Sequence, residues 1–157
     1  MSLNGDDELV REGIARCNFL LKNYEEAIEE FRDLSKRHPE ESIYFKIIGE
    51  ILLEFELYEE AIDSFVRASE LDPNDCTIYS YIADAKYELG LLDDAEKYYL
   101  KAIKADPEQV FNHSLLAEFY LETDRFGDAL KYFKKAHLLD PDNSYYKKKI
   151  EQIEEQT

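Results

Sequence analysis

The side chains that most often catalyse reactions are present in this chain, but they do not form a recognisable catalytic motif. The three histidines, His38, His113 and His137, fall at unrelated positions. No His-Glu-x-x-His pair, Cys-x-x-Cys pair or phosphate-binding glycine loop occurs. The order of serine, histidine and aspartate that would indicate a hydrolase triad is also missing. We therefore expect no enzyme activity.

Carboxylates are the most abundant chemical groups, with 36 Asp and Glu residues against 19 Lys and Arg. Two segments, Asp72-Pro-Asn-Asp75 and Asp140-Pro-Asp-Asn143, resemble calcium loops only in composition. They lack the twelve-residue pattern with its central glycine and closing glutamate. The two cysteines, Cys17 and Cys76, are too far apart in sequence to form a metal-binding pair. We expect no metal and no cofactor.

The net charge of −17 restricts the partners that the chain can attract. A negative field repels nucleic-acid phosphates and anionic membrane surfaces, and it attracts basic proteins or serves only solubility. Apolar runs such as Phe19-Leu20-Leu21 are too short to cross a membrane, and the N-terminus lacks a signal-peptide pattern. We expect a soluble, cytoplasmic protein that binds neither nucleic acid nor membranes.

Three series of residues repeat every 34 positions without insertion or deletion. Alanine is followed four residues later by an aromatic residue and twelve residues later by proline, and the series are Ala27, Ala61, Ala95, Ala129; Phe31, Phe65, Tyr99, Phe133; and Pro39, Pro73, Pro107, Pro141. Small alanine lets a neighbouring helix approach, the aromatic ring fills the space beside it, and proline ends the helix. The pattern predicts a chain of repeated helical pairs.

Helical periodicity places two helices in each repeat and one after the last. The expected helices are 8–21, 24–37, 42–55, 58–71, 76–89, 92–105, 110–122, 126–139 and about 144–155. In the last one, Tyr146, Ile150 and Ile153 share one face, so we expect it to cover the apolar side of the fourth repeat. Alternating strand patterns are missing, so the fold class is all-α.

The repeat resembles the tetratricopeptide repeat, whose signature is W-x2-L-G-x2-Y…A-x3-F…P over 34 residues. The second repeat reads Phe45-x2-Ile48-Gly49-x2-Leu52, followed by Ala61-x3-Phe65 and Pro73. The resemblance implies a right-handed superhelix of four repeats, 8–41, 42–75, 76–109 and 110–143, plus the capping helix, in one domain over 1–157. Arg11 and Asn18 fit a polar N-terminal cap. We expect Cys17, in the slot of Ala85, to be buried, and His113 to be a packing residue.

In this family the first helices of the repeats line a concave groove that binds a partner peptide or helix. The resemblance therefore implies a protein-protein interaction module or scaffold, and the acidic groove composition favours a basic and apolar partner, with Tyr87 and Phe111 as anchors. The groove residues expected from the register are Glu12, Arg16, Phe19, Lys46, Glu50, Glu54, Ser80, Asp84, Tyr87, Glu88, Phe111, Ser114 and Glu118. Three alternatives stay open: a merely solvated acidic face, a structural element that assembles into homo-oligomers, and a regulatory domain of a larger protein.

One ligand class of the family is disfavoured. Chaperone-adaptor members hold a C-terminal carboxylate with a clamp of lysine, asparagine and arginine side chains. At the matching places this chain has Glu12, Arg16, Ile47, Thr77 and Tyr81 or, one repeat later, Lys46, Glu50, Tyr81, Phe111 and Leu115. Neither set supplies the required cations and amides, and groove acids repel a carboxylate, so we do not expect binding of acidic chaperone tails.

Overall fold

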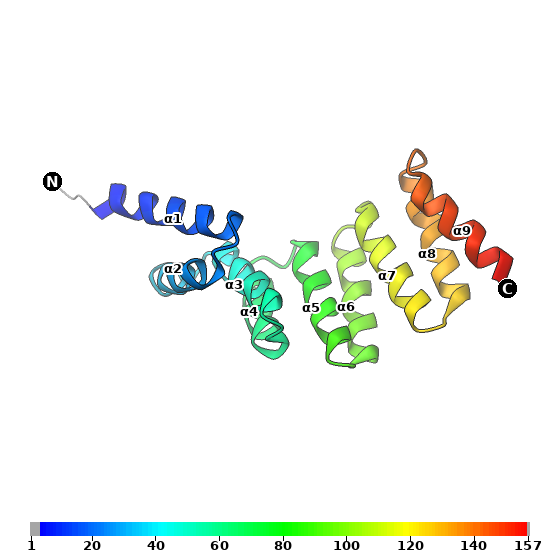
Figure 1. Ribbon diagram of the computed structural model, residues 1–157, viewed down its shortest axis with the longest axis horizontal. Helices are drawn as coiled ribbons and strands as arrows, with labels where there is room; N and C mark the ends of the chain where they lie inside the picture. The colour runs from blue at the N-terminus through cyan, green and yellow to red at the C-terminus, as the bar shows by residue number, and fades with distance from the viewer. Residues whose placement is uncertain (1–3, 157) are drawn as a thin grey trace. The chain divides into compact units, whose positions relative to one another are not determined.

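The computed structural model describes residues 4–156, and every regular element in that range is an α-helix (Figure 1). The helices are α1 (Asn4–Leu20), α2 (Tyr24–Arg37), α3 (Ser42–Glu54), α4 (Tyr58–Leu71), α5 (Cys76–Glu88), α6 (Leu92–Ala105), α7 (Val110–Glu122), α8 (Phe126–Leu139) and α9 (Ser144–Gln156). From α2 onward the predicted boundaries are confirmed to within one residue. Helix α1 begins before the predicted position 8, because the apolar periodicity used for prediction starts only at Leu9.

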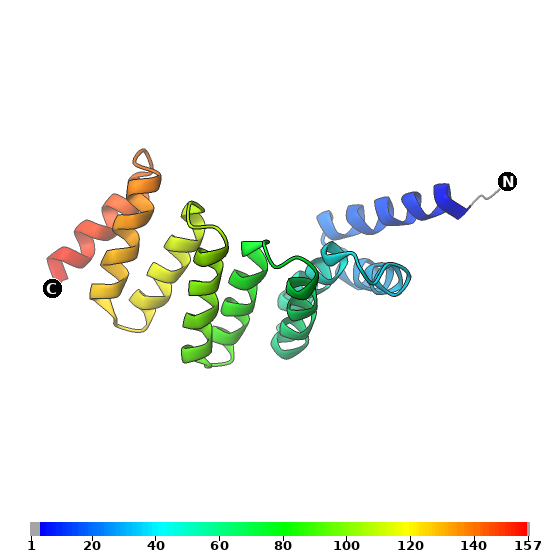
Figure 2. The ribbon, with the colours of Figure 1, turned by 180° about the vertical axis from the view of Figure 1, so that it is seen from behind.

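The helices group into two compact units, and the boundary falls between Pro73 and Asn74. In the first unit α1 packs on α2, α2 on α3 and α3 on α4. In the second unit each helix from α5 to α8 packs on the helix that follows it, as the views in Figures 1 and 2 also show. Within each unit the extensive helix–helix contacts therefore join helices that follow one another in the sequence, as expected for stacked repeats.

The repeated alanines and aromatic residues form the cores of both units. Ala27, Ala61, Ala95 and Ala129 are fully buried, and Phe31, Phe65 and Phe133 are also inaccessible to solvent. The Phe65 ring lies against Gly49, where an added Cβ would come within 2.7 Å of it. The motif residues thus have the packing roles that their spacing predicts.

Helix α9 covers α8, as predicted for the capping helix. Tyr146 and Ile153 are 7% and 2% exposed, and both join the core of the second unit with Phe133 and Ala136. Ile150 packs against the same core and is partly buried. The opposite face of α9 carries exposed Lys147, Lys148 and Glu151.

The turn inside each repeat has the same hydrogen-bond pattern. The Leu57 N–H donates to the Leu52 carbonyl and the Glu56 N–H donates to the Leu53 carbonyl, both at 2.9 Å. This pair of bonds ends a helix with one residue in the left-handed conformation. That residue is Lys22 (φ 62°), Glu56 (φ 58°), Gly90 (φ 73°) or Asp124 (φ 59°).

One expectation about the first repeat is wrong. Cys17 is exposed, not buried, because no helix of the first unit covers the outward side of α1. Arg11 forms an ion pair with Asp33 of α2 (3.5 Å), and the Asn18 side chain accepts a hydrogen bond from Asn23 (3.4 Å). Their role as a polar cap stays a prediction. His113, in contrast, is buried and stacks on Tyr132, as expected of a packing residue.

No helix within residues 4–156 is both long enough and apolar enough to span a lipid bilayer.

Candidate functional site

Four of the residues predicted to line a groove meet at one pocket of the second unit. Asp84, Tyr87 and Glu88 come from α5, and Glu118 comes from α7. Leu115, Phe119 and Glu122 of α7 and Tyr99 of α6 complete the lining of this cavity of about 230 Å³. We call these eight residues the acidic pocket. Helical spacing explains the set, because Asp84, Tyr87 and Glu88 lie on one face of α5 and Leu115, Glu118, Phe119 and Glu122 lie on one face of α7.

A hydrogen bond between a tyrosine and an aspartate forms the floor of the acidic pocket. The Tyr99 hydroxyl donates to Asp84 Oδ1 at 2.5 Å, and Tyr99 is 5% exposed. Burial raises the pKa of the Asp84 carboxyl, the hydrogen bond from Tyr99 opposes that effect, and the charges of Glu88 and Glu122 add to it. Burial also raises the pKa of Tyr99, so its hydroxyl keeps the proton that it donates.

Aromatic rings form the apolar wall of the pocket. Phe119 contacts Tyr87 edge to face with ring centroids 5.9 Å apart, and it contacts Tyr99 at 5.4 Å. A hydrogen bond to Glu122 is the main cause of a raised pKa at Tyr87. The tyrosines therefore combine an apolar surface with hydroxyls that hold carboxylates in place.

Two side chains of α9 contact one of the pocket carboxylates. The Tyr145 hydroxyl donates to Glu118 Oε1, and Lys149 Nζ lies 3.1 Å from Glu118 Oε2. The hydrogen bond and charge of Glu118 outweigh the effect of burial and raise the pKa of Lys149. Among the described residues, no lysine or arginine forms an ion pair with Asp84, Glu88 or Glu122. The pocket therefore keeps an excess of negative charge.

This arrangement can bind a cationic group that also has an apolar part. The aromatic rings and Leu115 suit the methylene stem of a lysine or arginine, and the carboxylates suit its charged end. The described residues contain no group of three or more His, Cys, Asp or Glu side chains placed to hold a metal ion.

Three other predicted groove residues of the second unit lie outside the acidic pocket. Ser80 is 4% exposed and donates to Asn112 Oδ1 at 2.8 Å, and Ser114 is 8% exposed and donates to the Phe111 carbonyl at 2.9 Å. Phe111 is 59% exposed on the first turn of α7 and does not line the pocket. The serines are fixed by contacts within and between helices, whereas Phe111 presents an exposed aromatic surface.

The six predicted residues of the first unit differ in their exposure and in their contacts. Glu12 accepts hydrogen bonds from Arg16 (2.7 Å) and from the Tyr44 hydroxyl (3.1 Å), and burial raises the pKa of Tyr44 to about 12. Phe19 packs against Tyr24 with ring centroids 6.2 Å apart. Lys46 and Glu50 are partly buried on α3, and Glu54 is exposed at its end. Their place in a binding groove stays a prediction.

Sequence reasoning missed Tyr99, Leu115 and Phe119 as members of the site, whereas the register places Glu122 on the same face of its helix as Glu118. Tyr99 occupies the aromatic position of the repeat, which was assigned to packing alone, yet it is the one tyrosine in a series of phenylalanines. In that repeat the position of Arg16, Glu50 and Glu118 holds an aspartate, Asp84, whose short side chain meets the added hydroxyl. Tyr99 and Asp84 depart together from the residues found at these positions in the other repeats, and this shared departure is the signal that could have revealed their contact.

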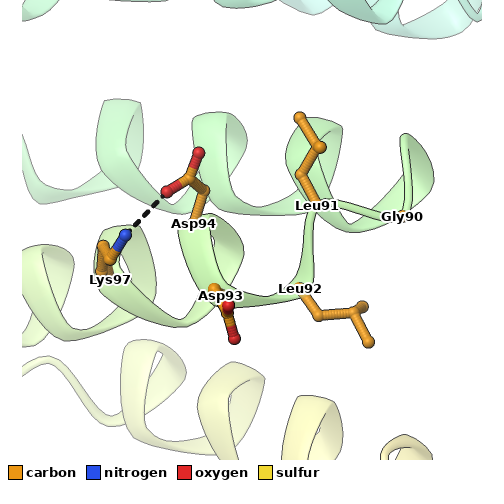
Figure 3. A pocket seen from close by; sticks show the side chains of 6 residues that line it. All are labelled: Gly90, Leu91, Leu92, Asp93, Asp94 and Lys97. Atoms are coloured by element: carbon orange, nitrogen blue, oxygen red, sulfur yellow. Dashed lines mark hydrogen bonds and ion pairs between the residues drawn. The ribbon is translucent and has the colours of Figure 1, made fainter.

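A larger hollow of about 460 Å³ lies at the turn between α5 and α6, where it is lined by Gly90, Leu91, Leu92, Asp93, Asp94 and Lys97. Figure 3 shows that Leu91 and Asp94 point to one side and Leu92 and Asp93 to the other. Lys97 Nζ bonds Asp94 Oδ1 at 2.9 Å, so the charges on that side already neutralise each other. The side chains do not converge on a ligand position, and we do not assign a function to this hollow.

Comparisons with known proteins agree with the observed helical pairs. The sequence pattern of the tetratricopeptide repeat family matches residues 21–75 and 82–144. No curated protein sequence matches the chain significantly.

Solved structures with the same fold include three repeat proteins of low sequence identity. MamA from Desulfovibrio magneticus RS-1 is 17% identical, with a TM-score of 0.81 over 97% of this chain and 86% of that one. TTC0263 from Thermus thermophilus is 20% identical, with a TM-score of 0.79 over 96% and 82%. YrrB, described as a TPR protein with an unusual peptide-binding site, is 22% identical, with a TM-score of 0.75 over 92% and 74%. At these identities the likeness shows the fold alone.

Proposed function

Because the chain belongs to the tetratricopeptide repeat family, we propose that it is a non-catalytic protein-binding module that binds its partner at the acidic pocket. The fold supports protein-protein interaction, and the pocket supports a more specific choice of ligand. We also propose that the two units belong to one domain, since the 34-residue register continues through the boundary without interruption.

The ligand that we propose is a peptide or helix with a lysine or arginine next to apolar side chains. The observation that carries the proposal is the combination of Asp84, Glu88 and Glu122 with the aromatic wall formed by Tyr87 and Phe119. An exposed ion pair contributes only about 0–1 kcal/mol, so the carboxylates alone give specificity but little affinity. The aromatic contacts must supply much of the remaining binding free energy.

Peptides with a variable central residue test the charge requirement. In a fluorescent series with Lys, Arg, Gln or Glu between leucine and phenylalanine residues, we expect the Lys and Arg peptides to bind most tightly. The Glu peptide should bind least, since the pocket carboxylates repel it. Fluorescence anisotropy gives the dissociation constants.

Two double variants test the position of the site at equal net charge. Glu88→Gln/Glu122→Gln removes two pocket carboxylates and should weaken binding of the Lys peptide about tenfold, or about 1.4 kcal/mol. Glu108→Gln/Glu151→Gln removes two exposed carboxylates outside the pocket lining and should leave the affinity within about twofold. Equal weakening by both variants would show that net charge, not the pocket, attracts the peptide.

A further inference from the structure

The outward face of α1 is apolar and uncovered. Leu9, Val10 and Ile14 are 72%, 58% and 51% exposed, Leu20 and Leu21 are 77% and 71% exposed, and Cys17 is exposed as well. Helix α2 lies beside α1 in both views (Figures 1 and 2), and no other described helix of the first unit packs on α1 to a comparable extent. We call this surface the α1 face.

On α3 and α7, within each unit, the corresponding surface is covered by the preceding helix. On α3, 34 residues after Val10, Ile14 and Cys17, the chain has Tyr44, Ile48 and Ile51, each at most 6% exposed. Helix α2 packs over them, with the Phe31 and Tyr44 rings 6.0 Å apart. On α7, Leu116 and Phe119 are buried, and Tyr99 of α6 contacts Phe119. Positions that are core elsewhere in the chain are therefore surface on α1.

The exposed apolar area is large enough for a small dimer interface. The five aliphatic side chains together expose on the order of 500 Å², which is as much as the largest apolar patch of a typical monomer. Pairing two such faces would remove about 1,000 Å² from water, near the lower limit for a specific interface.

The spacing of the α1 face suits pairing with an identical helix. Val10, Ile14, Cys17 and Leu21 follow one another at intervals of four, three and four residues. These intervals match those of the apolar seam in a two-helix coiled coil, in which each helix inserts its side chains between those of the other. Leu21 lies in the turn that follows α1.

Charge also favours this contact over others in so acidic a chain. From Leu9 to Leu21 the charged residues are Arg11, Glu12 and Arg16. Glu12 bonds Arg16 and Tyr44, and Arg11 forms an ion pair with Asp33. Two α1 faces can therefore meet without opposing carboxylates in this stretch, although each chain has a net charge of −17.

The C-terminal end does not offer a matching surface. The uncovered face of α9 carries exposed Lys147, Lys148, Glu151 and Glu155, and its apolar residues Tyr146 and Ile153 are buried against α8. Head-to-tail association would place the apolar α1 face on this charged surface. Association of identical faces about a two-fold axis avoids that mismatch.

We infer that the α1 face binds the α1 face of a second copy of this chain and forms a two-fold symmetric dimer. This interface is separate from the acidic pocket, so the chain dimerises whether or not the pocket binds a peptide.

Sedimentation equilibrium over a wide range of protein concentration tests the dimer. We expect the average mass to double from low to high concentration, and Ile14→Glu to abolish that increase. Leu138→Glu, a matched change at a leucine that is 71% exposed on α8, should leave it unchanged. Circular dichroism checks that both variants keep their helices. A monomer at every concentration, or a dimer that tolerates Ile14→Glu, would overturn the inference.

Thiol reactivity gives a second, local measurement. Cys76 is buried at 7% exposure, so Cys17 is the cysteine that reacts readily with a thiol reagent in the folded chain. Dimerisation should slow the reaction of Cys17 as protein concentration rises, and Ile14→Glu should remove that slowing. A mass increase without protection of Cys17 would assign the contact to another surface and reject the α1 face.

Discussion

The Asp84 carboxyl combines an expected cost in stability with the proposed role in binding. It is held by the Tyr99 hydroxyl beneath two other carboxylates, in surroundings that raise its pKa. A carboxyl in such a position favours the folded state less when it is ionised. Binding sites often keep a charge of this kind because a ligand of opposite charge compensates for it.

The pH dependence of stability follows from that pKa. Because the pKa of Asp84 is higher in the folded chain than in the unfolded one, the folded chain takes up this proton first as the pH falls. The stabilisation that this proton uptake gives the folded chain is complete below the pKa of Asp84 in the unfolded chain. It is lost as the pH rises through the pKa of Asp84 in the folded chain. Asp84→Asn should therefore raise the free energy of unfolding at neutral pH, with a difference that shrinks in acid.

Urea unfolding of wild type and variant across this pH range measures the effect. Glu108→Gln, which removes an exposed carboxylate outside the pocket lining, is the control and should change stability little. A neutral-pH loss of stability in Asp84→Asn would mean that the ionised carboxylate contributes a net stabilising hydrogen bond.

At the scale of the elements, the turns between paired helices offer a simple test of backbone strain. Lys22, Glu56 and Asp124 adopt the left-handed conformation that Gly90 adopts in the third repeat. This conformation costs a residue with a Cβ about 1 kcal/mol relative to glycine. The three turns therefore store strain that the third repeat's turn does not.

Glycine exchanges at these turns should change stability in opposite directions. Glu56→Gly and Asp124→Gly should each stabilise the chain by up to about 1 kcal/mol, and Gly90→Ala should destabilise it by about 1 kcal/mol or more. Gly127→Ala is the matched control, because Gly127 is helical and an added Cβ meets no atom within 4 Å. Denaturant unfolding should show no loss of stability for that variant; an equal loss at both glycines would contradict the strain argument.

The helices themselves could be predicted well because their signals are local. Alanine, aromatic residue and proline recur in a fixed register, and each acts on its own helix or the adjacent one. The exposure of Cys17 could not be predicted in that way. Its slot is core only when a preceding helix covers it, and that depends on neighbours that the repeat pattern does not encode.

At the scale of the whole molecule, net charge governs both stability and binding. A chain of net charge −17 repels itself when folded, and salt screens that repulsion. Raising NaCl from about 0.01 M to about 1 M shortens the screening length from about 30 Å to about 3 Å. The midpoint of thermal unfolding should therefore rise, while the affinity for a basic peptide should fall.

Circular dichroism on heating and anisotropy titrations at the same salt concentrations measure the two trends. A glycerol series at constant ionic strength is the control for general solvent effects. Salt that lowered the unfolding midpoint would show that ion pairs such as Arg125 with Glu96 outweigh the overall repulsion.

The candidate site was only partly predictable, because it depends on three-dimensional contacts between distant residues. Asp84, Glu88 and Glu118, which the register assigns to a groove, line one pocket. The register assigns Ser80 and Ser114 to the groove as well, but both side chains are buried. Ser80 donates a hydrogen bond to Asn112, and Ser114 donates one to the α7 backbone. A repeat pattern gives the side of a helix on which a residue lies, but not how far a neighbouring helix covers it.

If the acidic pocket binds a cationic peptide as proposed, the contact of Glu118 with Tyr145 and Lys149 makes the capping helix an internal competitor for it. A ligand that takes Glu118 must displace an ammonium group already supplied by the chain. By thermodynamic linkage, such a ligand weakens the docking of α9, and whatever loosens α9 strengthens the ligand's hold by the same factor. The packing of α9 on α8 would then depend on whether the acidic pocket holds a ligand.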